Sequence, residues 1–251
     1  MGAALAAPVM FPAPAPSYSA RTLSTPPLYS IDQVPCLWYP ALRPAAHILY
    51  LHANGTDLGI ECAVAQRMAR QTGCDVLAPE YPGYGALCGE SVSPEGAVVN
   101  ALRCYRYLLR HATRPVIIVG RSIGSGVAAQ LAARLADPPA GLVLISPFTS
   151  IAAMAPSVVP RMLLWGLYDT EAVVARCPTP LVVIHGDRDT LIAPAHGAAV
   201  VAASIASHKR LLRLPTSTHN ELDWQAIHGA IVQLAGHVGL QGHPVARDAP
   251  S

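Results

Sequence analysis

The residue best placed to do chemistry is a serine between two glycines. Ser122 lies in the pattern G-x-S-x-G from Gly120 to Gly124, after an apolar run and before a helical pattern. In such a strand-turn-helix context the pattern predicts a nucleophile elbow, whose tight turn needs glycines where backbones cross. A dinucleotide-binding fingerprint beginning at Gly124 is disfavoured, because its glycines would start inside the helix and the next strand ends in Ser146-Pro147 without an acidic residue. The pattern therefore indicates a nucleophilic serine rather than an ordinary glycine-rich turn.

A serine nucleophile requires a histidine and a carboxylate elsewhere in the chain. The hydroxyl is a poor nucleophile at neutral pH until a base takes its proton and an acid fixes the tautomer of that base. His219 follows the last predicted strand, and Asp187 and Asp189 follow the strand before it. Both places are strand-to-helix loops, where catalytic groups gather. Spacing leaves Asp187 and Asp189 as equal candidates.

Backbone amides must then stabilise the negative charge that develops on the substrate oxygen. We expect this oxyanion hole to use Ile123, next to the nucleophile, and Asn54, after the first parallel strand. The alternative for residues 52–55 is a plain polar turn, with His52 bracing the loop.

Short apolar runs alternate with longer helical patterns, which is typical of β-α units around a mostly parallel sheet with helices on both faces. The predicted strands are 47–51, 75–78, 116–119, 142–145, 181–184 and 211–214, with short antiparallel edge strands at 28–31 and 36–39. The predicted helices are 58–72, 94–110, 123–136, 194–206 and 222–237.

The composition fits one globular domain over residues 27–238, between an Ala/Pro-rich segment (1–26) and a tail (239–251), both expected to be flexible. The 17 basic and 15 acidic residues are scattered, which excludes nucleic acid as a partner. Six separated cysteines form neither a C-x-x-C pair nor a zinc site, so we expect free thiols in a reducing compartment and no metal or cofactor.

The expected cellular location depends on whether the sequence contains targeting or membrane-spanning segments. Prolines interrupt the first twenty residues, and no basic region precedes an apolar core, so no secretory signal is predicted. The uncharged stretch 138–160 contains five prolines, which argues against a transmembrane helix. We expect a cytoplasmic protein for which only peripheral membrane contact is open.

At these residues the chain resembles the ABHD and Bem46-like α/β-hydrolases, several of which are protein depalmitoylases. The similarity runs from about Phe11 to His237 and rests on residues 11–18, 51–59, 80–85, 120–124, 146–150 and 185–192. It implies the α/β-hydrolase fold, and its H-G-x-x-D pattern places the acid at Asp189. Ala53 stands where the family usually has glycine, and the N-terminus lacks the cysteine cluster that some depalmitoylases use for lipid anchoring.

The resemblance also shapes the expected substrate. The region 148–176, where larger hydrolases insert a lid, is short, so the lid is expected to be short or absent. Apolar residues at helical spacing in this region fit core packing better than an acyl-binding wall: Met154, Val158, Met162 and Trp165. We expect hydrolysis of esters or thioesters through an acyl-serine intermediate, on an acylated protein or a small acyl ester or thioester. Long-chain acyl-protein thioesters are the leading candidate substrates. The alternative functions are a serine peptidase of the same fold and a non-catalytic scaffold that binds a partner.

Overall fold

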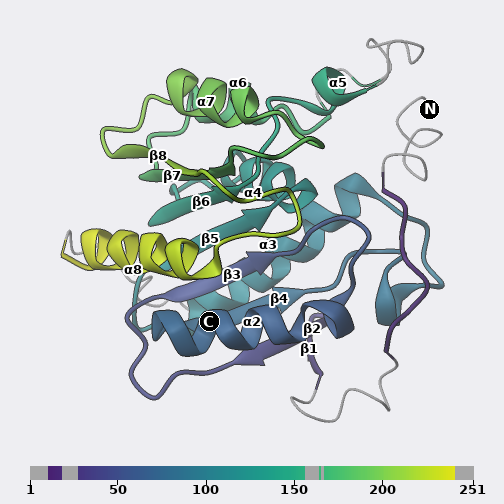
Figure 1. Cartoon of the computed structure of the whole chain (residues 1–251). Coiled ribbons are helices and arrows are strands. Elements are labelled where there is room, and N and C mark those ends of the chain that lie inside the picture. Colours follow the sequence, from purple (N-terminus) through teal and green to yellow (C-terminus); the bar gives the residue numbers. More distant parts are fainter. Residues whose placement is uncertain (1–10, 19–27, 156–163, 165–166, 241–251) are drawn as a thin grey trace.

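The computed structural model describes residues 11–18, 28–155, 164 and 167–240. One sheet of eight strands runs through the molecule in the order β1-β2-β4-β3-β5-β6-β7-β8 (Figure 1). The strands are β1 (Tyr29–Ile31), β2 (Val34–Tyr39), β3 (His47–Leu51), β4 (Asp75–Pro79), β5 (Val116–Arg121), β6 (Gly141–Ile145), β7 (Leu181–Gly186) and β8 (Lys209–Leu214). The pairs β1–β2 and β2–β4 are antiparallel, and the others are parallel. The predicted mostly parallel sheet is confirmed.

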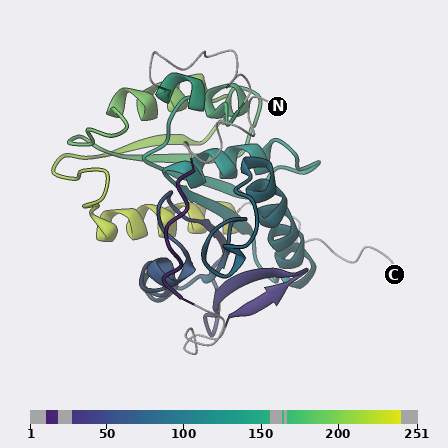
Figure 2. The same ribbon diagram turned by 90° about the vertical axis from the view of Figure 1, so that its right-hand side faces the viewer.

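Helices cover both faces of this sheet, as predicted (Figure 2). One face carries α2 (Leu58–Thr72) and α8 (Trp224–Leu240). The other carries α3 (Pro94–His111), α4 (Ile123–Ala132), α6 (Thr170–Val174) and α7 (Pro194–Ala203). The short η1 (Gly85–Leu87) and α5 (Ile151–Met154) lie in loops after β4 and β6.

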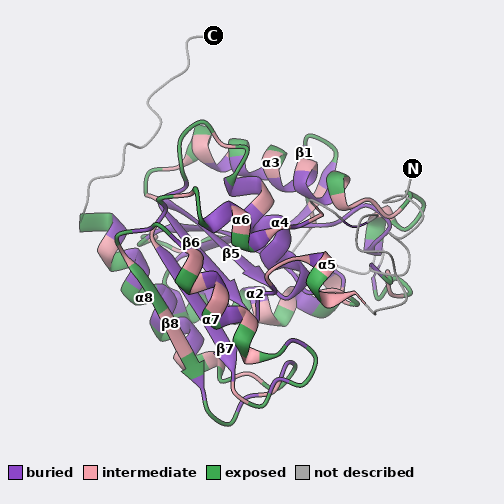
Figure 3. Cartoon of the chain, turned by 90° about the horizontal axis from the view of Figure 1, so that it is seen from above, coloured by how far each residue is buried: buried purple, intermediate pink, exposed green. Residues whose placement is uncertain are grey.

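Alternation along the central strands fills a separate core on each face. In β5, Ile118 joins the core under α3 and α4, whereas Ile117 and Val119 join the core under α2 and α8. Because successive side chains of a strand point to opposite faces, a strand buried on both faces reads as a continuous apolar run. Figure 3 shows this pattern, with buried central strands between helices whose outer faces are exposed.

Local signals set most helix boundaries. Asp57 caps α2 by accepting from the Ile60 amide at 3.1 Å, and Ser93 caps α3 by accepting from the Gly96 amide at 2.9 Å. The predicted helix 123–136 ends instead at Ala132, and the chain continues in i→i+3 turns towards Asp137 and its following prolines. The predicted edge strand at 36–39 belongs to β2, which lies inside β1 in the sheet order.

The expected flexible segment 1–26 differs from the structure at residues 11–18. Phe11 and Tyr18 are buried, at 3% and 7% exposure, and the Ser17 amide donates to the Asp57 carboxylate at 2.7 Å. The physical reason is that an aromatic residue at each end of a proline-rich stretch finds apolar partners in the domain. Residues 1–10 and 19–26 of that segment lie outside the described part of the chain.

At the other end, α8 continues to Leu240, so residues 239 and 240 of the expected tail are helical. The rest of that tail, 241–251, lies outside the described residues. Among the helices that the structure describes, each is too short or too polar to cross a bilayer.

Candidate active site

Ser122 stands at the turn between β5 and α4, at the carboxyl edge of the sheet. Its backbone has φ 53° and ψ −119°, a region that residues with side chains rarely adopt. The turn is crowded, since a Cβ on Gly124 would strike the carbonyl oxygens of Leu51 and His52, and one on Gly120 would strike the backbone of Gly124. The two glycines of the motif therefore allow the strained turn that projects the serine.

The structure brings the three sequence-predicted side chains into contact. His219, in the loop between β8 and α8, has Nε2 3.0 Å from the Ser122 hydroxyl oxygen. Its Nδ1 lies 2.7 Å from Oδ2 of Asp189, which follows β7. Because a carboxylate only accepts, Nδ1 carries the proton and Nε2 is free to take one from the serine. All three are less than a tenth exposed, so this hydrogen-bonded chain is largely shielded from water.

The Asp189 carboxylate is held by its own loop. Its Oδ1 accepts from the amides of Leu191 at 2.9 Å and Ile192 at 2.8 Å, leaving Oδ2 for the imidazole. His185 lies beside it, with Nε2 2.9 Å from the Ile192 carbonyl oxygen and 3.5 Å from Oδ2. Burial lowers the pKa of His185 from its ordinary value, so this ring is neutral and donates through Nε2. The carboxylate is thus fixed before any substrate arrives.

Asp187, the other candidate acid, faces elsewhere. Its carboxylate pairs with the Arg213 guanidinium of β8 at 2.7 Å, at the surface. The geometry therefore separates the two aspartates that spacing left equal.

Arg121, a buried cation beside the site, was not predicted from the sequence. Arg121, inside the elbow motif, donates to the His219 carbonyl oxygen at 3.5 Å and lies 3.7 Å from Glu61 of α2. Its guanidinium also stands 5.8 Å from the Trp224 ring, while the Tyr50 hydroxyl donates to Glu61 at 2.9 Å. Any residue can occupy this position of the G-x-S-x-G motif, so the motif gives no sign of its role. The structure shows that Arg121 connects the loop of His219 to α2 and α8.

The expected oxyanion residues lie on either side of this turn. Ile123 is the first residue of α4, and an amide at that position has no partner within its helix. Asn54 is in the loop after β3, the strand that pairs with β5. Its side-chain oxygen accepts from the Tyr84 hydroxyl at 2.7 Å and from the Gly55 amide at 3.0 Å. The oxyanion role of both amides stays a prediction.

The apolar residues considered as core or acyl-binding wall are described only in part. Met154, at the end of α5, is half-buried and packs against the core under α3 and α4. Val158, Met162 and Trp165 lie outside the described residues, as do the other residues of 156–163 and 165–166 in the region where a lid would be inserted. For Met154, the core packing that the sequence favours is present.

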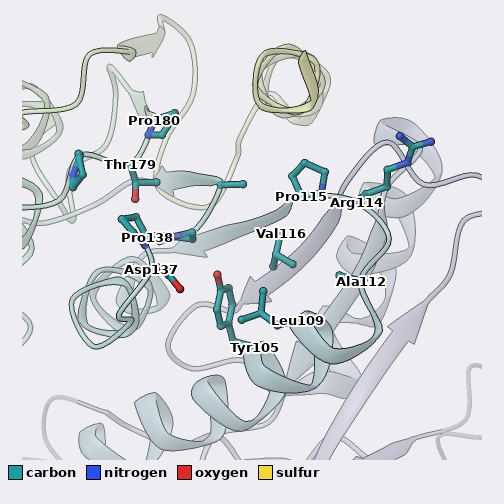
Figure 4. Close-up of a pocket in the computed structure, with 13 residues that line it drawn as sticks. Tyr105, Leu109, Ala112, Arg114, Pro115, Val116, Asp137, Pro138, Thr179 and Pro180 are labelled. Atoms are coloured by element: carbon teal, nitrogen blue, oxygen red, sulfur yellow. The ribbon is translucent and has the colours of Figure 1, made fainter. Parts of the chain in front are cut away.

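A cavity of about 390 Å³ lies beside Val116, at the start of β5 (Figure 4). Tyr105, Val116, Asp137 and Pro180 are among its lining residues, and Val116 begins β5 whereas Ser122 follows its end. Six residues of strand span about 20 Å, so this cavity belongs to the opposite edge of the sheet.

Comparison with known proteins places the chain among hydrolases. A family model described as serine aminopeptidase, S33, matches residues 43–171. Protein bem46 of Schizosaccharomyces pombe is 27% identical over 194 residues, which cover 72% of this chain and 63% of that protein. Lysophosphatidylserine lipase ABHD12 of Danio rerio is 32% identical over 179 residues, covering 62% of this chain and 47% of that protein. The chain thus spans less than two thirds of the length of these relatives.

Solved structures share the fold at low sequence identity. One described among two metagenome-derived lipolytic enzymes, LipS and LipT, superimposes with a TM-score of 0.66 at 17% identity. The superposition covers 80% of this chain and 97% of that one. This likeness shows the α/β-hydrolase architecture over most of the chain.

Proposed function

The chain belongs to the serine aminopeptidase S33 family of α/β-hydrolases, with Bem46 and ABHD proteins as relatives, and from that membership we propose that it is a serine hydrolase cleaving carboxylic esters. The observation that carries the proposal is the unbroken contact from Ser122 through His219 to Asp189. A scaffold without catalysis would have no use for a strained serine, a fixed tautomer and a preorganised carboxylate together.

Acylation of the enzyme follows from this geometry. The Ser122 oxygen attacks the ester carbonyl carbon while its proton passes to Nε2 of His219, 3.0 Å away. Asp189 stabilises the imidazolium that results, and in this proposal the amides of Ile123 and Asn54 receive the oxyanion. Collapse of the tetrahedral intermediate breaks the bond to the leaving oxygen, which takes the proton from Nε2. The product is an acyl-serine and a free alcohol.

Deacylation runs through the same groups. A water gives its proton to Nε2 of His219 and attacks the acyl carbon. Collapse of the second tetrahedral intermediate then breaks the bond to the Ser122 oxygen, which takes the proton back from Nε2. The acid is released and the serine is restored. The chain's own side chains account for every proton, so the proposed reaction requires no cofactor.

The proposed substrates carry a long acyl chain. Support comes from the relatives named as a lysophosphatidylserine lipase and from the solved structure described as lipolytic. An ester and a thioester of the same acid give the same acyl-serine. The proposal therefore specifies the acyl group of the substrate and leaves the leaving group open. Acyl-protein thioesters, the leading expectation from the resemblance, remain within this class.

Location is a separate expectation. A cytoplasmic chain that makes peripheral membrane contact would meet long-chain substrates at the bilayer surface, where they partition. Both the location and the contact stay predictions, and flotation of the purified chain with vesicles that contain its substrate tests the contact.

A substrate panel tests the proposed function. Purified protein is assayed on lysophospholipids, monoacylglycerols, acyl thioesters and peptide substrates of aminopeptidases, and each acyl substrate is tested as a series from short to long acyl chains. Each buried methylene is worth about 0.8 kcal/mol, so we expect kcat/KM to rise more than tenfold from short to long chains. A flat chain-length profile, or faster turnover of peptides, would contradict the proposal, and Ser122→Ala supplies the background rate.

A further inference from the structure

A fully buried carboxylate lies behind the loop that carries Asn54. Glu80 follows β4 and has no exposed surface. Its Oε2 accepts from the Tyr18 hydroxyl at 2.7 Å and the Leu58 amide at 3.1 Å. Its Oε1 accepts from the Tyr81 amide at 3.0 Å and faces Nε2 of His52 at 3.2 Å. Both oxygens are fully used, which is what a buried carboxylate needs in order to be stable.

His52 begins the loop and is fixed on every side. Nδ1 lies 3.0 Å from the Ala53 carbonyl oxygen and Nε2 lies 3.2 Å from Oε1 of Glu80, so both ring nitrogens face acceptors. Burial lowers the pKa of His52, but the hydrogen bond and charge of Glu80 outweigh burial and raise it. The ring stacks on Tyr81 at 4.0 Å, and the Tyr81 hydroxyl donates to the His52 carbonyl oxygen at 3.1 Å. These contacts hold the His52 ring and backbone at the entrance to the loop, and the contact to Nε2 comes from Glu80.

Glu80 keeps its place partly through a residue far away in the sequence. Tyr18 brings its ring against Gly85, where an added Cβ would strike both the tyrosine and Glu80. The neighbouring Ser17 hydroxyl and amide both donate to Asp57, the cap of α2, which closes the other end of the same loop. Residues 17 and 18 thus hold the loop of residues 52–57 at both ends.

We propose that Tyr18 and Glu80 are positioning residues that fix the Asn54 amide through His52, so that residues 17 and 18 support the catalytic apparatus. This rests on the proposed function, because it concerns the oxyanion hole of that reaction. An oxyanion donor works only when it is placed within a fraction of an ångström before the charge develops. Removing one donor from Glu80 loosens His52, and the amide two residues further along the chain loses its alignment.

The test compares two tyrosines that each lose only a hydroxyl. Tyr18→Phe removes the donor to Glu80, whereas Tyr105→Phe alters a buried tyrosine at the opposite edge of the sheet. Steady-state kinetics on one ester and thermal melts are measured for both variants and for Glu80→Gln. For Tyr18→Phe we expect kcat to fall about tenfold or more with KM little changed, because the lost alignment acts on the transition state. Tyr105→Phe is expected to keep the wild-type kcat even where its melting temperature falls.

Glu80→Gln keeps the shape of the side chain but replaces one carboxylate oxygen, which only accepts hydrogen bonds, with an NH2 group, which donates them. It is expected to lower kcat further than Tyr18→Phe, again with KM retained. The proposed positioning role is overturned if Tyr18→Phe keeps the wild-type kcat. It is also overturned if kcat and the melting temperature fall by the same amounts in Tyr18→Phe and Tyr105→Phe. A wild-type protein with no esterase activity would instead refute the proposed function, so the two failures are distinguishable.

Discussion

Two aspartates that are separated by a single residue have different environments in this fold. Asp189 turns inward to two loop amides and the imidazole, and Asp187 turns outward to Arg213. Residue spacing could not distinguish them, because the direction of each side chain depends on how the loop after β7 folds. The resemblance to a known family favoured Asp189, and the geometry agrees with it.

Substitution of each aspartate by asparagine measures this difference. We expect Asp189→Asn to lower kcat about a thousandfold or more, because an amide can hold the imidazole in the tautomer that cannot accept the serine proton. Asp187→Asn is expected to stay within about threefold of wild type, since an exposed ion pair contributes little. Steady-state kinetics on one ester decide the matter, and the reverse ranking would contradict the assignment.

Other residues around the site could not be found from the sequence. Arg121, Glu80 and Tyr18 act through contacts with segments that are between 22 and 98 positions away along the chain. No local pattern encodes such contacts. The strand-to-helix loops were a sufficient signal for Ser122 and His219, because chemistry in this architecture collects at the carboxyl edge of the sheet.

At the scale of elements, the crossing of α4 over the end of β3 decides whether the nucleophile can be displayed. Gly124 permits that crossing, whereas Gly229 of α8 has open space around its Cβ position. We expect Gly124→Ala to lower kcat more than a hundredfold or to prevent folding, because the methyl group would strike backbone that cannot move aside. Gly229→Ala is the matched control, expected to stabilise the protein by about 0.5–1 kcal/mol with unchanged activity.

Melts and ester kinetics on the two alanine variants provide the measurement. An active, stable Gly124→Ala protein would contradict the account of the elbow. A destabilised Gly229→Ala protein would contradict the open space around that position.

The elements themselves were predicted to different degrees. The bounds of α2 were predicted correctly, because Asp57 caps its start and Gly73 ends it with a left-handed residue. The end of α4 was placed too late, since the residues after Ala132 are good helix formers and only the approach to the prolines turns the chain. The short helices α5 and α6 were missed, because four or five residues show no periodicity.

At the scale of the whole molecule, stability should depend on pH through a buried histidine. Burial, with the charge of Arg67, lowers the pKa of His228 from its ordinary value, and its Nε2 has no hydrogen-bond partner in the described structure. As the pH falls below about 6.5, the unfolded chain takes up a proton that the folded protein resists. The stability linked to this group is therefore present above that pH and is lost on acidification.

Replacing His228 with leucine removes both the titration and the unpaired nitrogen. We expect the melting temperature of His228→Leu to rise relative to wild type by more at pH 5 than at pH 8. Calorimetry at the two pH values is the measurement, and an equal shift at both would contradict the linkage.

The central claim, that Ser122 is an activated nucleophile, is tested most directly by covalent labelling. The folded protein is treated with a fluorophosphonate and its mass is measured intact, beside Ser122→Ala and Ser125→Ala, which changes a buried serine one turn along the same helix. We expect one adduct, located on Ser122, in the wild type and in Ser125→Ala, and none in Ser122→Ala. An unlabelled wild-type protein, or an adduct that survives in Ser122→Ala, would contradict this claim.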